Sequence, residues 1–144
     1  MPGKPTLARR KGEFFLKREK PLPFIKLSDI DESEIVKGFR ARFVHTDRMT
    51  SAYWQIAAGS SLPDHSHPHE QVTTIIRGRF EMSVGGETQT IEAGDVVVIP
   101  SGAKHRAQAL TDCFILDVFS PVREVYRLTA SVSRALMNLT PASS

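Results

Sequence analysis

The chain has 144 residues, the size of one domain, and its 40% hydrophobic and 24% charged content is typical of a globular protein. No apolar run of about 20 residues and no secretory signal is present, so we expect a cytoplasmic protein without a membrane-spanning helix. The single cysteine, Cys113, excludes an internal disulfide, and the formal net charge of +3 is unevenly distributed.

Residues 1–22 are predicted to form a basic N-terminal arm. Its first 20 residues carry seven Lys or Arg and two Glu, a net charge of +5, whereas the rest of the chain has a net charge of −2. A basic arm can contact nucleic acid or an acidic surface. No basic stripe or aromatic platform continues into the body, which favours a solvated or partner-packed arm. We therefore expect no nucleic-acid partner.

Residues 23–122 are predicted to form an all-β domain. The segment PLPFIKLSDIDESEIVKG indicates a short strand and a polar connection. From Phe39 onward, short segments rich in β-branched and aromatic residues alternate with Gly, Pro, Asp or Ser, a pattern typical of a sandwich or barrel. Gly85-Gly86 predicts a two-residue hairpin turn. The apolar run CFILDVF predicts a buried Cys113.

Residues 123–144 are predicted to form a C-terminal helix and tail. Apolar residues recur at steps of three and four and form one helical stripe, which consists of Val125, Leu128, Val132, Ala135, Leu136 and Leu139. We expect this helix to pack on the outside of the sheets or on a second subunit.

Three of the five histidines are concentrated in the segment HSHPHEQ, residues 65–71. This segment is part of the pattern G-x5-H-x-H-x3-[E/Q]-x6-G, which starts at Gly59 and ends at Gly78. After 15 residues a second pattern, G-x5-P-x-G-x2-H, runs from Gly94 to His105. The two halves occur in order, with a gap that suits one hairpin.

The spacing of these residues indicates a metal site. Residues two apart in a strand share a face, so His65 and His67 are expected to point the same way, and Gln71 to return to that face. His105 follows a Pro-Gly turn and can meet them inside a closed sheet. Three imidazoles and one oxygen suit one divalent transition metal (Zn, Ni, Fe, Mn or Cu) better than Ca²⁺.

The two patterns resemble the motifs of the cupins, which are small double-stranded β-helix (jelly-roll) barrels. The resemblance covers about residues 39–121 and implies that the metal ligands are His65, His67, Gln71 and His105. His69 departs from the ligand spacing and is interpreted as lying behind the ligands or at the cavity rim. Glu70 should face away, and His45 is interpreted as structural or cavity-lining.

The metal motif departs from the usual cupin pattern at one ligand. Gln71 replaces the common glutamate, so a divalent site keeps a charge of +2 instead of +1 and should attract anions more strongly. This feature favours a small anionic substrate over oxygen-activating chemistry.

A second resemblance lies in FILDVFSPVREVY, where Asp117, Phe119 and Arg123 have the spacing D-x-F-x3-R. It is similar to the KdgF-type pectin-degradation cupins, which linearise 4,5-unsaturated monouronates. The resemblance implies that Asp117 transfers a proton, Arg123 binds the uronate carboxylate and Phe119 forms a wall of the sugar pocket. The alternative is structural: Phe119 in the core, Asp117 bonded to the chain break, and Arg123 paired with the helix or capping the barrel.

The sequence thus predicts a metal-dependent cupin enzyme acting on a small carboxylated sugar or keto-acid, of the uronate ring-opening type. A non-catalytic or sensory small-molecule-binding cupin is the alternative, and a cupin dioxygenase is the third. We also expect a homodimer, because the segment LPFIKL can add to a partner's sheet and the terminal helix offers a second apolar surface.

Overall fold

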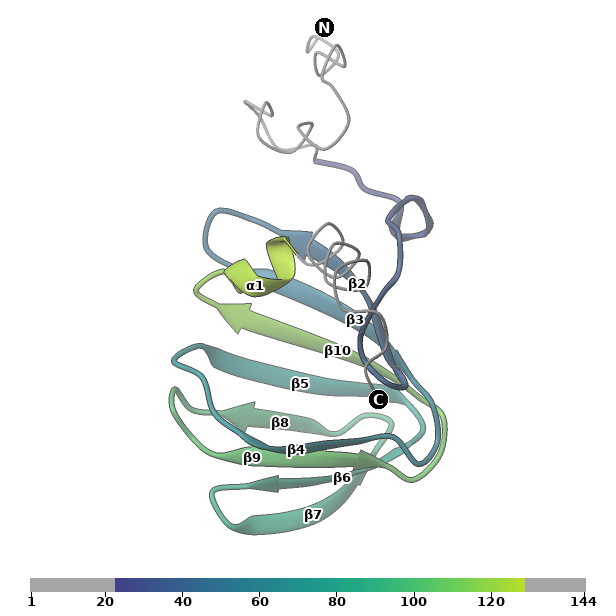
Figure 1. Cartoon of the computed structure of the whole chain (residues 1–144), viewed down its shortest axis with the longest axis vertical. Helices are drawn as coiled ribbons and strands as arrows, with labels where there is room; N and C mark the ends of the chain where they lie inside the picture. Colours follow the sequence, from purple (N-terminus) through teal and green to yellow (C-terminus); the bar gives the residue numbers. More distant parts are fainter. Residues whose placement is uncertain (1–22, 129–144) are drawn as a thin grey trace, which may run out of the picture.

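Two antiparallel sheets packed face to face form the body of the protein (Figure 1). The computed structural model describes residues 23–128. One sheet has six strands in the order β1-β2-β3-β10-β5-β8, and the other has four in the order β4-β9-β6-β7. Their bounds are β1 Ser33–Val36, β2 Phe39–His45, β3 Thr50–Ile56, β4 Ser61–His65, β5 Glu70–Arg77, β6 Arg79–Val84, β7 Glu87–Glu92, β8 Val96–Ile99, β9 His105–Ala109 and β10 Cys113–Ser120.

The hydrophobic core lies between the two sheets, and strict alternation in the central strands creates it. Every second residue of β3 and of β10 is buried, which is the period-two pattern of a strand with one inner face. The inner face of β10 includes a carboxylate, Asp117, which lies opposite Ala52 on one side and Thr73 on the other. The same alternation that builds the core therefore places Asp117 inside it.

Glycines with positive φ close the tight turns. Gly85 and Gly86 have φ of 57° and 91° between β6 and β7, so the predicted hairpin is confirmed. Gly78 has φ of 99°, and a Cβ there would collide with the carbonyl of Asp112 and with the buried Cys113. The chain reversal before β6 therefore requires glycine.

The predicted all-β cupin jelly roll is confirmed, with differences at its ends. The short strand expected in LPFIKL is absent from its described residues 23–27, where the chain is irregular and enters a 3₁₀ turn at Leu27–Asp29. The strand before Phe39 is β1, which lies further along, in the segment expected to be a polar connection. Where the C-terminal helix was predicted, the described residues contain one short helix, α1, Glu124–Arg127. The remaining residues of that prediction, 129–144, and the predicted basic arm, 1–22, lie outside the described residues. Within residues 23–128, no helix has the length and hydropathy to cross a membrane.

Candidate metal centre

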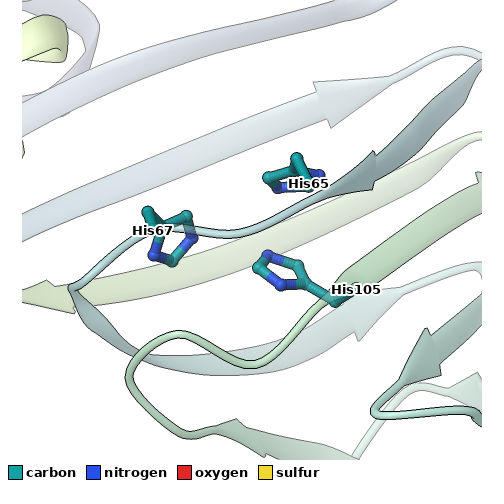
Figure 2. Close-up of side chains that lie close together, drawn as sticks. All are labelled: His65, His67 and His105. Carbon is teal, nitrogen blue, oxygen red and sulfur yellow. The ribbon is translucent and has the colours of Figure 1, made fainter.

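Three predicted ligands meet between the two sheets. His65 ends β4, His105 begins β9, and the two residues face each other across the β4–β9 pair. His67 lies in the loop after β4, and its ring points toward the other two (Figure 2). One ring nitrogen from each histidine lies within 4.8 Å of the others. The structure thus brings together His65, His67 and His105, as the motif spacing predicted.

The two halves of the sequence motif are fastened to each other by hydrogen bonds. The Gly102 N–H donates to the His67 carbonyl at 2.9 Å, and the Ser101 hydroxyl donates to the Pro68 carbonyl at 2.6 Å. Gly102 has φ of 78°, a conformation that glycine adopts without strain. The Pro-x-Gly turn therefore holds the loop that carries His67 while it leads the chain into His105.

The tautomer of each histidine follows from its backbone partner. The Nδ1 atoms of His65, His67 and His105 lie 2.9, 3.0 and 2.9 Å from the carbonyl oxygens of Pro63, His69 and Ala103. A carbonyl oxygen can only accept, so each Nδ1 carries the proton and each Nε2 keeps a lone pair. This is the arrangement that orients imidazole ligands for a metal.

Gln71 completes the cluster and supplies a direct test of whether the residues fit a metal ion. Its Oε1 lies 3.0 Å from His67 Nε2, and both residues are buried. Because His67 Nδ1 carries the proton, the lone pair of its Nε2 faces a lone pair of Gln71 Oε1, and the two repel each other. A cation bound by both atoms removes this repulsion. Two nitrogen or oxygen ligands bound about 2.1 Å from one ion lie about 3–3.5 Å apart. The buried Nε2 of His105 also has no hydrogen-bond partner among the described residues. The residues fit a metal ion.

Burial keeps these ligands neutral. Desolvation lowers the pKa of His67 to about 4, and the positive charge of Arg123 adds to this effect. Desolvation also lowers the pKa of His105. Neutral imidazoles are the form that binds metals, so the site does not need to lose protons from these two ligands at neutral pH.

Behind Gln71, a chain of hydrogen bonds runs to a buried carboxylate. Gln71 Nε2 donates to Thr73 Oγ1 at 3.0 Å, and the Thr73 hydroxyl donates to Asp117 Oδ1 at 2.6 Å. The indole N–H of Trp54 donates to Asp117 Oδ2 at 2.9 Å. Desolvation raises the pKa of Asp117 to about 6, although these hydrogen bonds hold it lower than burial alone would. Asp117 is therefore ionised at pH 7 but titrates close to neutrality.

Arg123 lies against aromatic rings next to the cluster. Its guanidinium carbon lies 4.6 Å from the ring centre of Tyr126 and 5.2 Å from that of Phe119. Nη2 donates to the Tyr126 hydroxyl at 3.3 Å and Nη1 to His69 Nδ1 at 3.5 Å. The buried Nε–H has no partner within residues 23–128. Arg123 is thus a partly buried cation whose buried Nε–H is free to bind a ligand.

A pocket extends from the histidines into the barrel. Its polar lining consists of the four proposed ligands together with Thr73, Asp117 and the Tyr126 side chain. The rest of the wall is apolar, and Phe119 and Trp54 belong to it together with Ile35, Val36, Phe39, Ile56, Leu62, Phe80, Met82, Ala107 and Ile115. A ligand bound here would contact polar groups at the metal cluster and apolar side chains along the rest of the pocket.

The other predicted residues take supporting positions. His69 lies outside the three-histidine cluster, and its Nε2–H donates to the Val122 carbonyl at 3.2 Å. Glu70 is exposed, as expected. His45 Nδ1 lies 2.8 Å from the Thr50 hydroxyl, and its ring stacks on Phe43. Phe119 is buried in the core, yet its ring also contacts His67 edge-on at 5.7 Å between centroids.

Three residues of the site were missed by the sequence reasoning. Thr73 lies two positions after Gln71 in the same strand, so strand alternation alone would have placed it on the inner face. Trp54 and Tyr126 carry no motif signal, since aromatic residues in a strand or helix are ordinarily interpreted as core. Their place beside the site depends on long-range packing.

Comparison with known proteins agrees with this architecture. Residues 52–119 match the cupin domain family. An uncharacterised protein of Streptomyces coelicolor is 28% identical over 102 residues, which are 67% of this chain and 97% of that protein. The structure of KdgF from Halomonas sp. is 27% identical with a TM-score of 0.68 and covers 72% of this chain and 98% of that one. An RmlC-like cupin from Shewanella frigidimarina has a TM-score of 0.70 at 24% identity, over 74% and 96% of the two chains.

The chain has the cupin jelly-roll fold, with a three-histidine site suited to a metal ion. Among the structures it resembles is that of KdgF. The identity of the metal is left open by the ligands, since imidazole and amide donors accept several transition metals.

Proposed function

We propose that this protein is a metal-dependent enzyme that opens the ring of a 4,5-unsaturated monouronate. The likeness to KdgF and the Gln-containing ligand set support this activity. The observation that carries the proposal is Asp117, a buried carboxyl that lines the pocket beside the metal cluster and has a pKa of about 6. A base whose pKa lies near the working pH is suited to accept and return a proton.

The chemistry can be written with this chain's residues. A bound divalent metal would supply positive charge that polarises oxygen atoms of the substrate. Asp117 takes the proton from the hydroxyl on the hemiacetal carbon while the bond from that carbon to the ring oxygen breaks. The ring oxygen leaves as an enolate, and protonation of the neighbouring alkene carbon gives the ketone. One proton is removed and one is returned, so the reaction is an isomerisation without a co-reactant.

Arg123 is proposed to bind the substrate carboxylate. Its guanidinium presents a planar set of donors, and the buried Nε–H is unused within the described residues. Tyr126 lies under the guanidinium and also lines the pocket, so it connects the cation to the ligand space. His69 and Tyr126 hold the other two nitrogens, which fixes the orientation of the fork.

The apolar wall favours a second candidate, the binding of a small apolar acid without catalysis. Most of the pocket is lined by side chains such as Phe39, Phe80 and Met82, which offer no hydrogen bonds to sugar hydroxyls. A carboxylate at the metal would then be followed by an apolar group. The homodimer and the cytoplasmic location stay predictions beside either function.

The two candidates are separated by one assay. Metal-loaded protein is mixed with unsaturated galacturonate, and loss of the ultraviolet absorbance of the conjugated double bond is followed. The proposal expects decay well above the spontaneous rate. Decay at the spontaneous rate with full metal occupancy would reject the enzyme and leave the binding protein, which is then probed with short aliphatic and aromatic carboxylic acids by calorimetry.

A further inference from the structure

The amide group of Gln71 has two ends that differ chemically but are almost equal in size. Only its oxygen can bind a metal, and an exchange of the two ends would aim an NH₂ group at the cluster. A glutamate at this position has no such ambiguity, because both of its oxygens can bind. The replacement of Glu by Gln therefore creates a need for a group that fixes the orientation of the amide.

The structure contains that group. Asp117 at neutral pH can only accept hydrogen bonds, and the Trp54 indole can only donate, so Oδ2 is occupied by Trp54 at 2.9 Å. The Thr73 hydroxyl lies 2.6 Å from Oδ1 and must donate its proton there. Its oxygen is then left as an acceptor toward Gln71, 3.0 Å away. Only the NH₂ end of Gln71 can satisfy it.

We propose that Thr73 is a positioning residue that makes Gln71 present its carbonyl oxygen to the metal. Thr73 is 1% exposed and lies two residues after Gln71 on the inner face of β5, directly opposite Asp117 of β10. The inference rests on the metal site of the proposed function but does not depend on the substrate.

The test is metal binding by substrate-free protein, measured by titration with Co²⁺ and by the visible spectrum of the bound ion. Thr73→Val removes the hydroxyl at nearly constant shape and is expected to weaken Co²⁺ binding about 10- to 100-fold, as losses of such supporting contacts do. Thr73→Ser keeps the hydroxyl and should restore affinity and spectrum. Thr74→Val is the matched control, since Thr74 is the next residue of β5 and faces the opposite side.

A double-mutant cycle separates positioning from general damage. In Gln71→Glu protein no amide needs orienting, so adding Thr73→Val should change Co²⁺ affinity less than about threefold. An equal loss in the wild-type and Gln71→Glu backgrounds, or wild-type affinity in Thr73→Val, would overturn the proposal. If Thr73→Val does not fold, Thr73→Ala gives the same comparison without β-branching. Failure of the uronate assay alone would leave this result standing, because no substrate is used.

Discussion

The indole N–H of Trp54 and the carboxylate of Asp117 form a buried 2.9 Å hydrogen bond between neighbouring strands β3 and β10. This hydrogen bond stabilises the ionised form of Asp117, which burial destabilises. Trp54→Phe should lower the free energy of unfolding at pH 7 by about 2 kcal/mol, because a buried ionised acceptor loses its donor. Urea unfolding with the exposed-face variant Tyr53→Phe as control measures this loss.

The same variant should show a defined pH dependence. The pKa of Asp117 is raised to about 6, above its ordinary value of 3.8, so the buried charge destabilises the fold above pH 6 and is absent below pH 4. The difference between wild type and Trp54→Phe should therefore be largest above pH 6 and shrink toward pH 4. A difference that grows on acidification would contradict the assigned charge state. The measurements use metal-free protein, so that loss of metal at low pH does not change the measured free energy of unfolding.

Metal binding should release few protons at pH 6. Three imidazoles with an ordinary pKa of about 6.5 would release about two protons there. The pKa of His67 is about 4 and that of His105 is also lowered, so the number of protons released should fall well below two. Calorimetry in buffers of different protonation enthalpy measures the number of protons released per metal ion bound. Release of about two protons would contradict the expectation that the histidine ligands are neutral at pH 6. As the pH falls through about 4, His67 takes up a proton and metal binding should be lost.

One metal ion per chain is expected in purified protein, and His67→Ala should lose most of it. His67 contacts Gln71 on one side and lies beside His105 on the other, so its removal opens the centre of the cluster. His45→Ala is the control, because His45 bonds to Thr50 away from the cluster. Elemental analysis of the purified proteins measures the number of metal ions per chain. Full occupancy in a His65, His67 and His105 triple-alanine variant would reject the site.

Gln71→Glu should keep the metal but weaken binding of a simple carboxylate such as acetate about 10- to 100-fold. The substitution removes one unit of positive charge from a partly desolvated site, and Coulomb attraction falls accordingly. Gln89→Glu makes the same charge change at an exposed position of β7 and should have little effect. Calorimetry at fixed salt compares the two. Equal or tighter acetate binding in Gln71→Glu would exclude a charge-based role for the glutamine.

Under the uronate proposal, Asp117→Asn and Arg123→Ala should impair different kinetic constants of the enzyme. Asp117→Asn cannot accept the proton and should lower kcat about 10²- to 10⁴-fold with metal retained. Arg123→Ala should mainly raise KM, because it removes a carboxylate contact. Asp31→Asn and Arg106→Ala are exposed controls. Full activity in Asp117→Asn would remove the proton-transfer role while leaving the substrate class intact.

The sequence predicted the fold and the three histidines because both depend on local signals: strand alternation, turn glycines and ligand spacing. Strand alternation does not account for the position of His67. This residue was expected to share a strand face with His65, yet β4 ends at His65 and the loop tied to Gly102 aims His67. Trp54 and Tyr126 were missed because their roles arise from contacts between segments far apart in the chain, such as the 63-residue separation of Trp54 and Asp117. Strand alternation predicts the inner-face position of Thr73, but not its hydrogen bond to Asp117, 44 residues away.

The pocket and the hydrophobic core share residues, and this couples ligand choice to folding. Trp54, Ile56, Phe80, Met82 and Ile115 are buried core side chains and also walls of the ligand space. A large-to-small change that admits a bulkier ligand would also lower stability by about 2–5 kcal/mol. A domain of this size has a total stability of only about 5–15 kcal/mol. New specificities in this barrel are therefore expected to arise through swaps of similar volume or after prior stabilisation, one wall residue at a time.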